Sequence, residues 1–124
     1  MNILIRTIPH DDQRYDTVGD WVWTDMDNHA LDIFVSDLGD WRKEALVAVH
    51  ELVEALLCRE HGISTETVDA WDNAYDGAGE PGDAAGCPYR NEHRSATTIE
   101  MLLAHELDVQ WQTYEEAINR AGED

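Results

Sequence analysis

Hydrophobic and polar residues alternate over the first part of the chain, which is the period of a β-strand. Three runs of this kind cover residues 2–8, 17–23 and 30–35. The third is the clearest, because Leu31, Ile33 and Val35 share one face. Three turn-forming residues separate the second run from the third: Asp25, Asp27 and Asn28. We therefore expect N-terminal strands that include a β-hairpin over about residues 18–36.

After this region, the pattern becomes that of helices. Asp40 is suited to cap a helix N-terminus, residues 45–58 contain no Gly, Pro or Asn, and Gly62 is suited to end the helix. This predicts a helix of about 20 residues. Shorter helices are expected over residues 65–75, 91–107 and 110–121, and residues 76–89 are expected to form a loop rich in Gly, Pro and Asp.

These elements predict an α+β fold in one domain, residues 1–124: a small antiparallel sheet of the N-terminal strands, packed against a helical layer. The long helix is expected to be buried in that layer, because apolar residues surround it in nearly every direction. They are Leu46, Val47, Val49, Leu52, Val53, Leu56 and Leu57.

The acidic composition of the chain limits the kinds of molecule that it is expected to bind. Eight Lys and Arg residues against 27 Asp and Glu give a net charge of −19, which disfavours direct binding to nucleic acid or to an acidic membrane and would attract a basic protein. We find no signal-peptide pattern and no membrane span, so we expect a cytoplasmic protein. Cys58 and Cys87 are then expected to be reduced, with a disulfide between them as the alternative.

The long helix contains the sequence His50-Glu51-Leu52-Val53-Glu54, a His-Glu-x-x-Glu motif. Side chains four residues apart lie on the same face of a helix, so His50 and Glu54 could bind one metal ion. In His-Glu-x-x-His metallohydrolases, the Glu after the first His is the general base, a role that would fall to Glu51.

The alternative is a structural role, in which Glu51 and Glu54 face water near Arg14 or Lys43 and His50 is a satisfied core residue. We favour the metal site, because an imidazole and two carboxylates in a largely buried helix are unfavourable unless they are paired or metal-bound.

His93 is the candidate third ligand, since Ala96 and Thr97 on its helix face are small enough to let that face approach the long helix. Glu100, on the same face, is expected to be a fourth ligand or to orient a histidine. His61 is too far from His50 along the helix axis to share the ion. Asp69, Asp72 and Asp76 are interpreted as a solvated acidic stripe, with a divalent cation as the alternative.

A set of short motifs follows the His50–Ala55 sequence: Cys58 and Gly62, then residues 68–69 with 72, 80–83, 88–89, 92–93 and 99–100. Through these motifs, residues from about 47 to 114 resemble a group of small uncharacterised proteins encoded by phages and prophages. The motif helix of this group is similar to that of minimal zincin-like metallohydrolases, in which a β-hairpin lies over that helix and a later helix supplies the third ligand. The resemblance implies His50, Glu54 and His93 as ligands and Glu51 as the base. Glu54 stands where zincin peptidases have a histidine.

We interpret the chain as a small phage-type metal-binding protein and a zincin-like metal-dependent hydrolase, acting on a peptide or another small molecule. Zinc is the expected divalent ion, and manganese or iron are alternatives, because a carboxylate ligand favours harder metals. A peptide substrate would pair with residues 30–35 if they form an exposed sheet edge.

Two other functions remain open. The charge of −19 suits a non-enzymatic acidic protein that imitates DNA and inhibits a host enzyme. A carboxylate cluster of Glu51, Glu54, Asp69 and Glu100 would suit an all-helical, Mg²⁺-dependent nucleotide pyrophosphatase.

Overall fold

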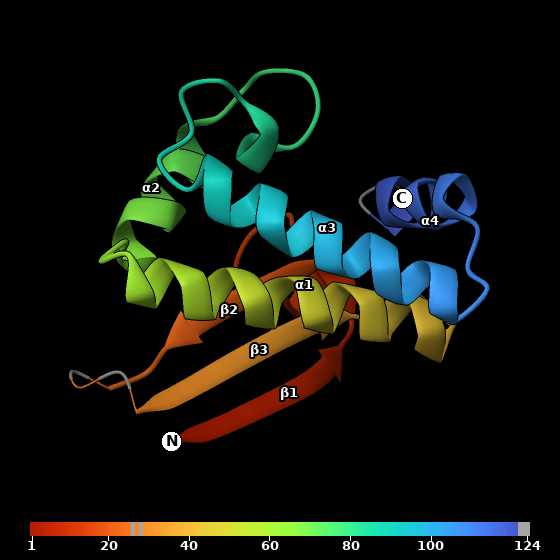
Figure 1. Ribbon diagram of the computed structural model, residues 1–124, viewed down its shortest axis with the longest axis horizontal. Helices are drawn as coiled ribbons and strands as arrows, with labels where there is room; N and C mark the ends of the chain where they lie inside the picture. Colours follow the sequence, from red (N-terminus) through yellow and green to blue (C-terminus); the bar gives the residue numbers. More distant parts are fainter. Residues whose placement is uncertain (26, 28, 122–124) are drawn as a thin grey trace.

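A computed structural model describes residues 1–25, 27 and 29–121 of this chain. The described part is α+β, with three strands and four α-helices. The strands are β1 (Asn2–Ile8), β2 (Gly19–Trp23) and β3 (Ala30–Ser36). The helices are α1 (Trp41–Glu60), α2 (Thr65–Ala74), α3 (Arg90–Glu106) and α4 (Trp111–Ala121), and short 3-10 helices form η1 (His10–Asp12) and η2 (Pro81–Asp83). Figure 1 shows α1 lying across the sheet and α3 lying along α1.

The predicted strands and hairpin are confirmed, but the predicted antiparallel sheet is wrong because the sheet is mixed. Its strand order is β1-β3-β2, in which β2 is antiparallel to β3 and β1 is parallel to it. Residues 30–35 do not form an exposed sheet edge, since β3 is the central strand, so the condition for pairing a peptide substrate with them is not met. Leu31, Ile33 and Val35 of β3 are almost fully buried. The most apolar strand therefore lies between β1 and β2, where a neighbouring strand covers each of its edges. Asn28, one of the predicted turn formers, lies outside the described residues.

Helix α1 has the length that its capping residues predict. The Asp40 carboxylate accepts a hydrogen bond from the backbone N–H of Arg42, and Gly62 follows the last turn with a positive φ of 73°. One side of α1 packs on β2 and β3, and another side packs against α3. The motif residues therefore lie between the sheet and a second helix. The prediction that apolar residues bury this helix in nearly every direction holds only in part, because Leu46 and Val47 are buried but Leu56 is exposed.

The remaining elements agree with the sequence to within a residue or so at each end. Ser64 caps α2, and the loop that follows α2 contains η2. Ala96 is fully buried, which allows the close approach of α3 to α1 that its size predicts. Cys58 and Cys87 are buried free thiols. Within the described ranges, the helices are too short or too polar to cross a membrane.

Candidate metal centre

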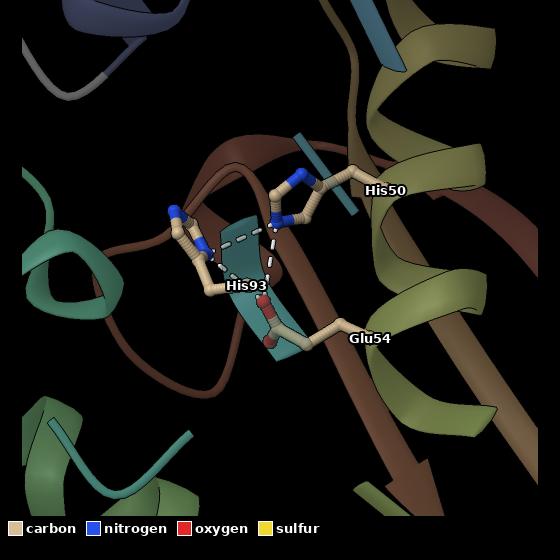
Figure 2. Close-up of side chains that lie close together, drawn as sticks. All are labelled: His50, Glu54 and His93. Carbon is tan, nitrogen blue, oxygen red and sulfur yellow. Dashed lines mark hydrogen bonds and ion pairs between the residues drawn. The ribbon is translucent and has the colours of Figure 1, made fainter. Parts of the chain in front are cut away.

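Three side chains of the motif helix and α3 meet at one point. His50 and Glu54 lie one turn apart on α1, and His93 reaches them from the first turn of α3 (Figure 2). Nε2 of His50 lies 3.1 Å from Oε2 of Glu54 and 3.2 Å from Nδ1 of His93. Nδ1 of His93 lies 3.0 Å from the same Glu54 oxygen. Each residue thus contributes one ligand atom to a small triangle.

The size of this triangle fits a metal ion. Ligands at about 2.0–2.1 Å from a tetrahedral zinc ion are separated from one another by about 3.3 Å. The three observed separations, 3.0 to 3.2 Å, are close to that value and need only a small expansion. Two imidazole nitrogens and one carboxylate oxygen are also ligand atoms that zinc accepts.

His50 is oriented by a carboxylate on its other ring nitrogen. Its Nδ1 lies 2.7 Å from Oε1 of Glu100, and the second oxygen of Glu100 accepts a hydrogen bond from the Tyr114 hydroxyl on α4. Metal-bound histidines commonly donate their other N–H to a carboxylate in this way. Glu100 thus hydrogen-bonds His50 on the ring nitrogen that faces away from the triangle.

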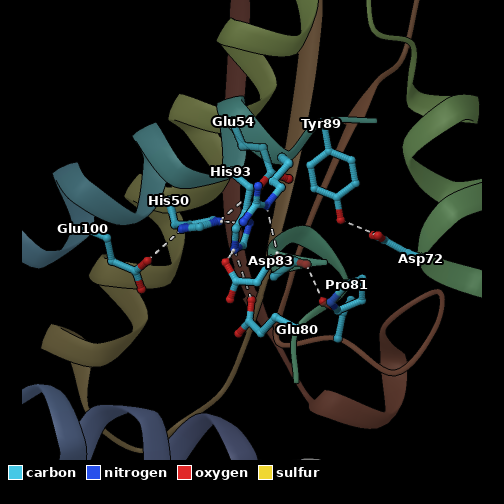
Figure 3. Close-up of polar contacts among 12 residues, drawn as sticks. His50, Glu54, Asp72, Glu80, Pro81, Asp83, Tyr89, His93 and Glu100 are labelled. Carbon is cyan, nitrogen blue, oxygen red and sulfur yellow. Dashed lines mark hydrogen bonds and ion pairs between the residues drawn. The ribbon is translucent and has the colours of Figure 1, made fainter. Parts of the chain in front are cut away.

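His93 has a similar arrangement (Figure 3). Its Nε2 lies 3.3 Å from Asp83 and 3.6 Å from Glu80, both from the loop around η2. Gly82 packs so tightly on this ring that an added Cβ would lie 2.4 Å from Nδ1. Both histidines therefore present one nitrogen to the triangle and the other to carboxylates.

Glu54 is buried and satisfied entirely by side-chain donors. Oε1 accepts a hydrogen bond from the indole N–H of Trp21 at 3.0 Å, while Oε2 faces the two histidines. Burial alone would raise the pKa of Glu54, but the hydrogen bonds from His50 and His93 lower it to about 2. The prediction that Glu54 lies in a buried environment is confirmed, and the alternative in which it faces water is wrong.

The histidines show the opposite shift. Burial alone would lower the pKa of His50, but hydrogen bonds to Glu100 and Glu54 raise it well above 6.5. The pKa of His93 is also raised, because its hydrogen bond to Glu54 outweighs the effect of burial. Without metal, the carboxylates therefore hold protons on this pair of rings, and an ion would displace those protons.

Glu51 lies beside the triangle without belonging to it. Its carboxylate rests against β2, where an added Cβ on Gly19 would lie 2.4 Å from Oε1 of Glu51, so only glycine leaves room for it. Burial and the charge of Glu54 raise the pKa of Glu51 well above its ordinary range. In the described residues, Arg14 bonds Asp20 and Asp69 rather than Glu51 or Glu54.

A cavity of about 740 Å³ opens on these residues. Its wall includes His50, Glu51, Glu54 and His93, together with Gly79 and Gly82 from the loop before α3. β2 contributes Gly19, Asp20 and Trp21 to the wall. The sheet edge that lines the cavity is therefore β2, not β3.

Three other acidic and histidine residues that the sequence singles out, His61, Asp69 and Asp72, bond to residues outside the triangle. His61 contacts Glu92 at 2.6 Å. Asp69 binds Arg14, and Asp72 accepts hydrogen bonds from the hydroxyls of Tyr15 and Tyr89. The described residues hold two groups able to ligate a metal, and neither contains Glu51, Asp69 or Glu100: His50, Glu54 and His93; and Glu80, Asp83 and His93.

Sequence reasoning missed four residues that complete this site: Trp21, Glu80, Asp83 and Tyr114. Tyr114 follows Trp111 by one helical turn, a spacing that identifies the inward face of α4 but not its partner. Glu80 and Asp83 flank a Pro-Gly pair that predicts a turn. None of these signals indicates contact with the motif helix.

Neither the known protein families, nor the curated proteins, nor the solved structures include a match to this chain.

Proposed function

We propose that the chain is a metal-dependent hydrolase with a mononuclear centre formed by His50, Glu54 and His93. The observation that carries this proposal is the triangle of ligand atoms, with sides of 3.0 to 3.2 Å, at the wall of a large cavity. When bound, a divalent ion such as zinc, manganese or iron polarises a carbonyl or phosphoryl oxygen and lowers the pKa of a water ligand.

Glu51 is the general base in this proposal. Glu51 lines the same cavity as His50, Glu54 and His93, and it interacts electrostatically with His50 and Glu54. A carboxyl group whose pKa is raised is a stronger base than an ordinary carboxylate, so it is suited to accept and return a proton. Gly19 keeps the space that this carboxylate occupies.

The charge of the cavity favours neutral or cationic substrates. The described lining residues include Asp16, Glu80, Asp83 and Glu115 in addition to the site carboxylates, and contain neither Lys nor Arg. The excess of carboxylates over basic side chains in this lining would repel a phosphate-rich substrate. This supports a peptide or another amide rather than a nucleotide, so a nucleotide pyrophosphatase is the less favoured function.

The test is metal content and hydrolysis measured on the same preparation. Protein purified without a histidine tag is loaded with zinc, dialysed, and measured by elemental analysis. We expect about one equivalent of metal for the wild type and for Glu60→Gln, an exposed control on the same helix, and far less for Glu54→Gln. Fluorogenic peptides of neutral, basic and acidic sequence are then compared with phosphodiesters.

Retention of metal by Glu54→Gln, or its absence from the wild type, would refute the centre. Metal without cleavage of any peptide or phosphodiester would refute the hydrolase assignment and leave a structural metal site. Cleavage of phosphodiesters alone would refute the peptide substrate.

A further inference from the structure

Strand β1 is exposed along almost its whole length. It is an edge strand of the sheet, and Ile3, Leu4 and Ile5 are 41%, 48% and 46% exposed. Figure 1 shows β1 at the outer margin of the sheet, away from α1 and α3. A long edge strand with exposed apolar residues is a template for pairing with another strand.

The backbone groups available for pairing follow from the bonds that β1 already makes. The N–H of Asn2 bonds His29, and the carbonyl of Ile8 accepts from Asp37. In a parallel pair, alternate residues point their backbone groups toward the partner, so the even-numbered residues of β1 face β3. The N–H and C=O groups of Ile3, Ile5 and Thr7 therefore point away from the sheet.

The distribution of charge along the chain indicates which kind of strand could pair with β1. The chain has 27 acidic residues, but the first of them is Asp11, so β1 contains only one charged side chain, Arg6. Two copies of this acidic chain could approach through β1 without placing carboxylates of the two strands against each other. A basic protein would instead be attracted to the acidic surfaces.

The order of residues in β1 is also self-complementary. An antiparallel pair centred on Leu4 places Leu4 opposite Leu4 of the second copy, and Ile3 opposite Ile5 of that copy. Asn2 then faces Arg6 of the second copy. This register pairs Ile3 and Ile5 through their free backbone groups, and each exposed apolar residue from 3 to 5 meets an apolar one. Centring on Ile5 would instead place Leu4 opposite Arg6.

We propose that β1 is a homodimerisation strand, which joins two copies antiparallel about Leu4 into one six-stranded sheet. Ile3 and Ile5 lie in register with Leu31 and Ile33 on the face covered by α1, so pairing extends the core of each copy. Because both copies carry a charge of −19, added salt screens their repulsion and strengthens the dimer.

Sedimentation equilibrium over a series of protein and NaCl concentrations tests this proposal. We expect a monomer–dimer equilibrium that shifts toward dimer as salt rises. Leu4→Lys should weaken it by at least about tenfold, because two ammonium groups would face each other across the pair. Leu102→Lys, the same change at a residue that is 63% exposed on α3, should leave it within about twofold.

Cysteine cross-linking tests the register. Residues opposite each other in a non-hydrogen-bonded antiparallel pair are about 4.5 Å apart between Cα atoms, close enough for a disulfide. Leu4→Cys should therefore form a covalent dimer under mild oxidation, whereas Ile5→Cys should not, since Ile5 faces Ile3. The proposal is overturned by a monomer at all concentrations, by a dimer that Leu4→Lys leaves intact, or by cross-linking of Ile5→Cys in place of Leu4→Cys.

Discussion

Replacing Gly82 by alanine gives a sharp test of the centre, because it perturbs a proposed ligand without removing one. The added Cβ would lie 2.4 Å from Nδ1 and 2.5 Å from Cγ of His93. The loop around Gly82 is held on both sides, by the bond from the Trp71 indole N–H to Pro81 and by the bond from Arg90 to Asp83. We therefore expect the His93 ring, rather than the loop, to move.

The size of the effect follows from these distances. An ordinary carbon contact requires at least 3.4 Å, so the ring must move by about 1 Å. Metal–ligand distances tolerate only about 0.2 Å, so a displaced Nδ1 no longer coordinates. We expect zinc affinity to fall by at least about a hundredfold, equivalent to about 2.8 kcal/mol.

Competition with a chromophoric chelator measures this affinity. Gly86→Ala is the matched control, since it adds a Cβ to the same loop. That Cβ would lie 3.3 Å from the Trp71 ring and would not contact His93. Circular dichroism and thermal melts of the metal-free proteins separate loss of fold from loss of affinity. If Gly82→Ala bound zinc within about threefold of the wild type, His93 would not be a ligand at this position.

Three further predictions concern the residues around the triangle. Glu51→Gln should keep the fold and the metal but abolish peptide hydrolysis; residual activity above about a thousandth of the wild type would exclude Glu51 as the base. Glu100→Gln should weaken zinc binding by about 10–100-fold, because it alters the acceptor of His50, and Glu106→Gln on the exposed face of α3 should have no effect on chelator competition. The third prediction concerns pH: in the metal-free protein the raised pKa values of His50 and His93 stabilise the fold below about pH 6.5, and this stabilisation is lost as pH rises through them. Zinc binds the deprotonated rings, so the rise in Tm that zinc produces should be larger at about pH 8 than at about pH 6; an equal rise would show that binding displaces no protons.

Local signals predicted the helices well. Asp40 and Gly62 set the ends of α1 through contacts within a few residues, so the sequence contains the information directly. The strands were also predictable, because alternation of Leu31, Ile33 and Val35 needs no distant partner. The order and direction of the strands could not be predicted. Both β1 and β2 can pair with β3 in a parallel or an antiparallel direction, and hydrophobic alternation does not distinguish the two.

The residues of the candidate site also fall into two groups, those that the sequence could predict and those that it could not. His50 and Glu54 meet because one turn of helix separates them, and His93 could be proposed because Ala96 on its face is small enough for close packing. Trp21 and Asp83 lie far from the motif in sequence, and only the folded sheet and loop bring them to Glu54 and His93. The sequence left two roles open for Glu100, because its contacts with His50 and Tyr114 depend on how α3 packs against α1 and α4.

The buried charge gives a physical reason for the centre to take up a cation. Glu51, Glu54 and Glu100 lie around two histidines, and Trp21 and Tyr114 satisfy two of these carboxylates with neutral donors. The two imidazoles carry positive charge only when they are protonated, and no Lys or Arg belongs to the described cavity wall. Above the pKa values of these rings, Glu54, whose own pKa is lowered, keeps a negative charge that the histidines no longer balance. A divalent ion would restore that balance at the point where the three ligand atoms meet.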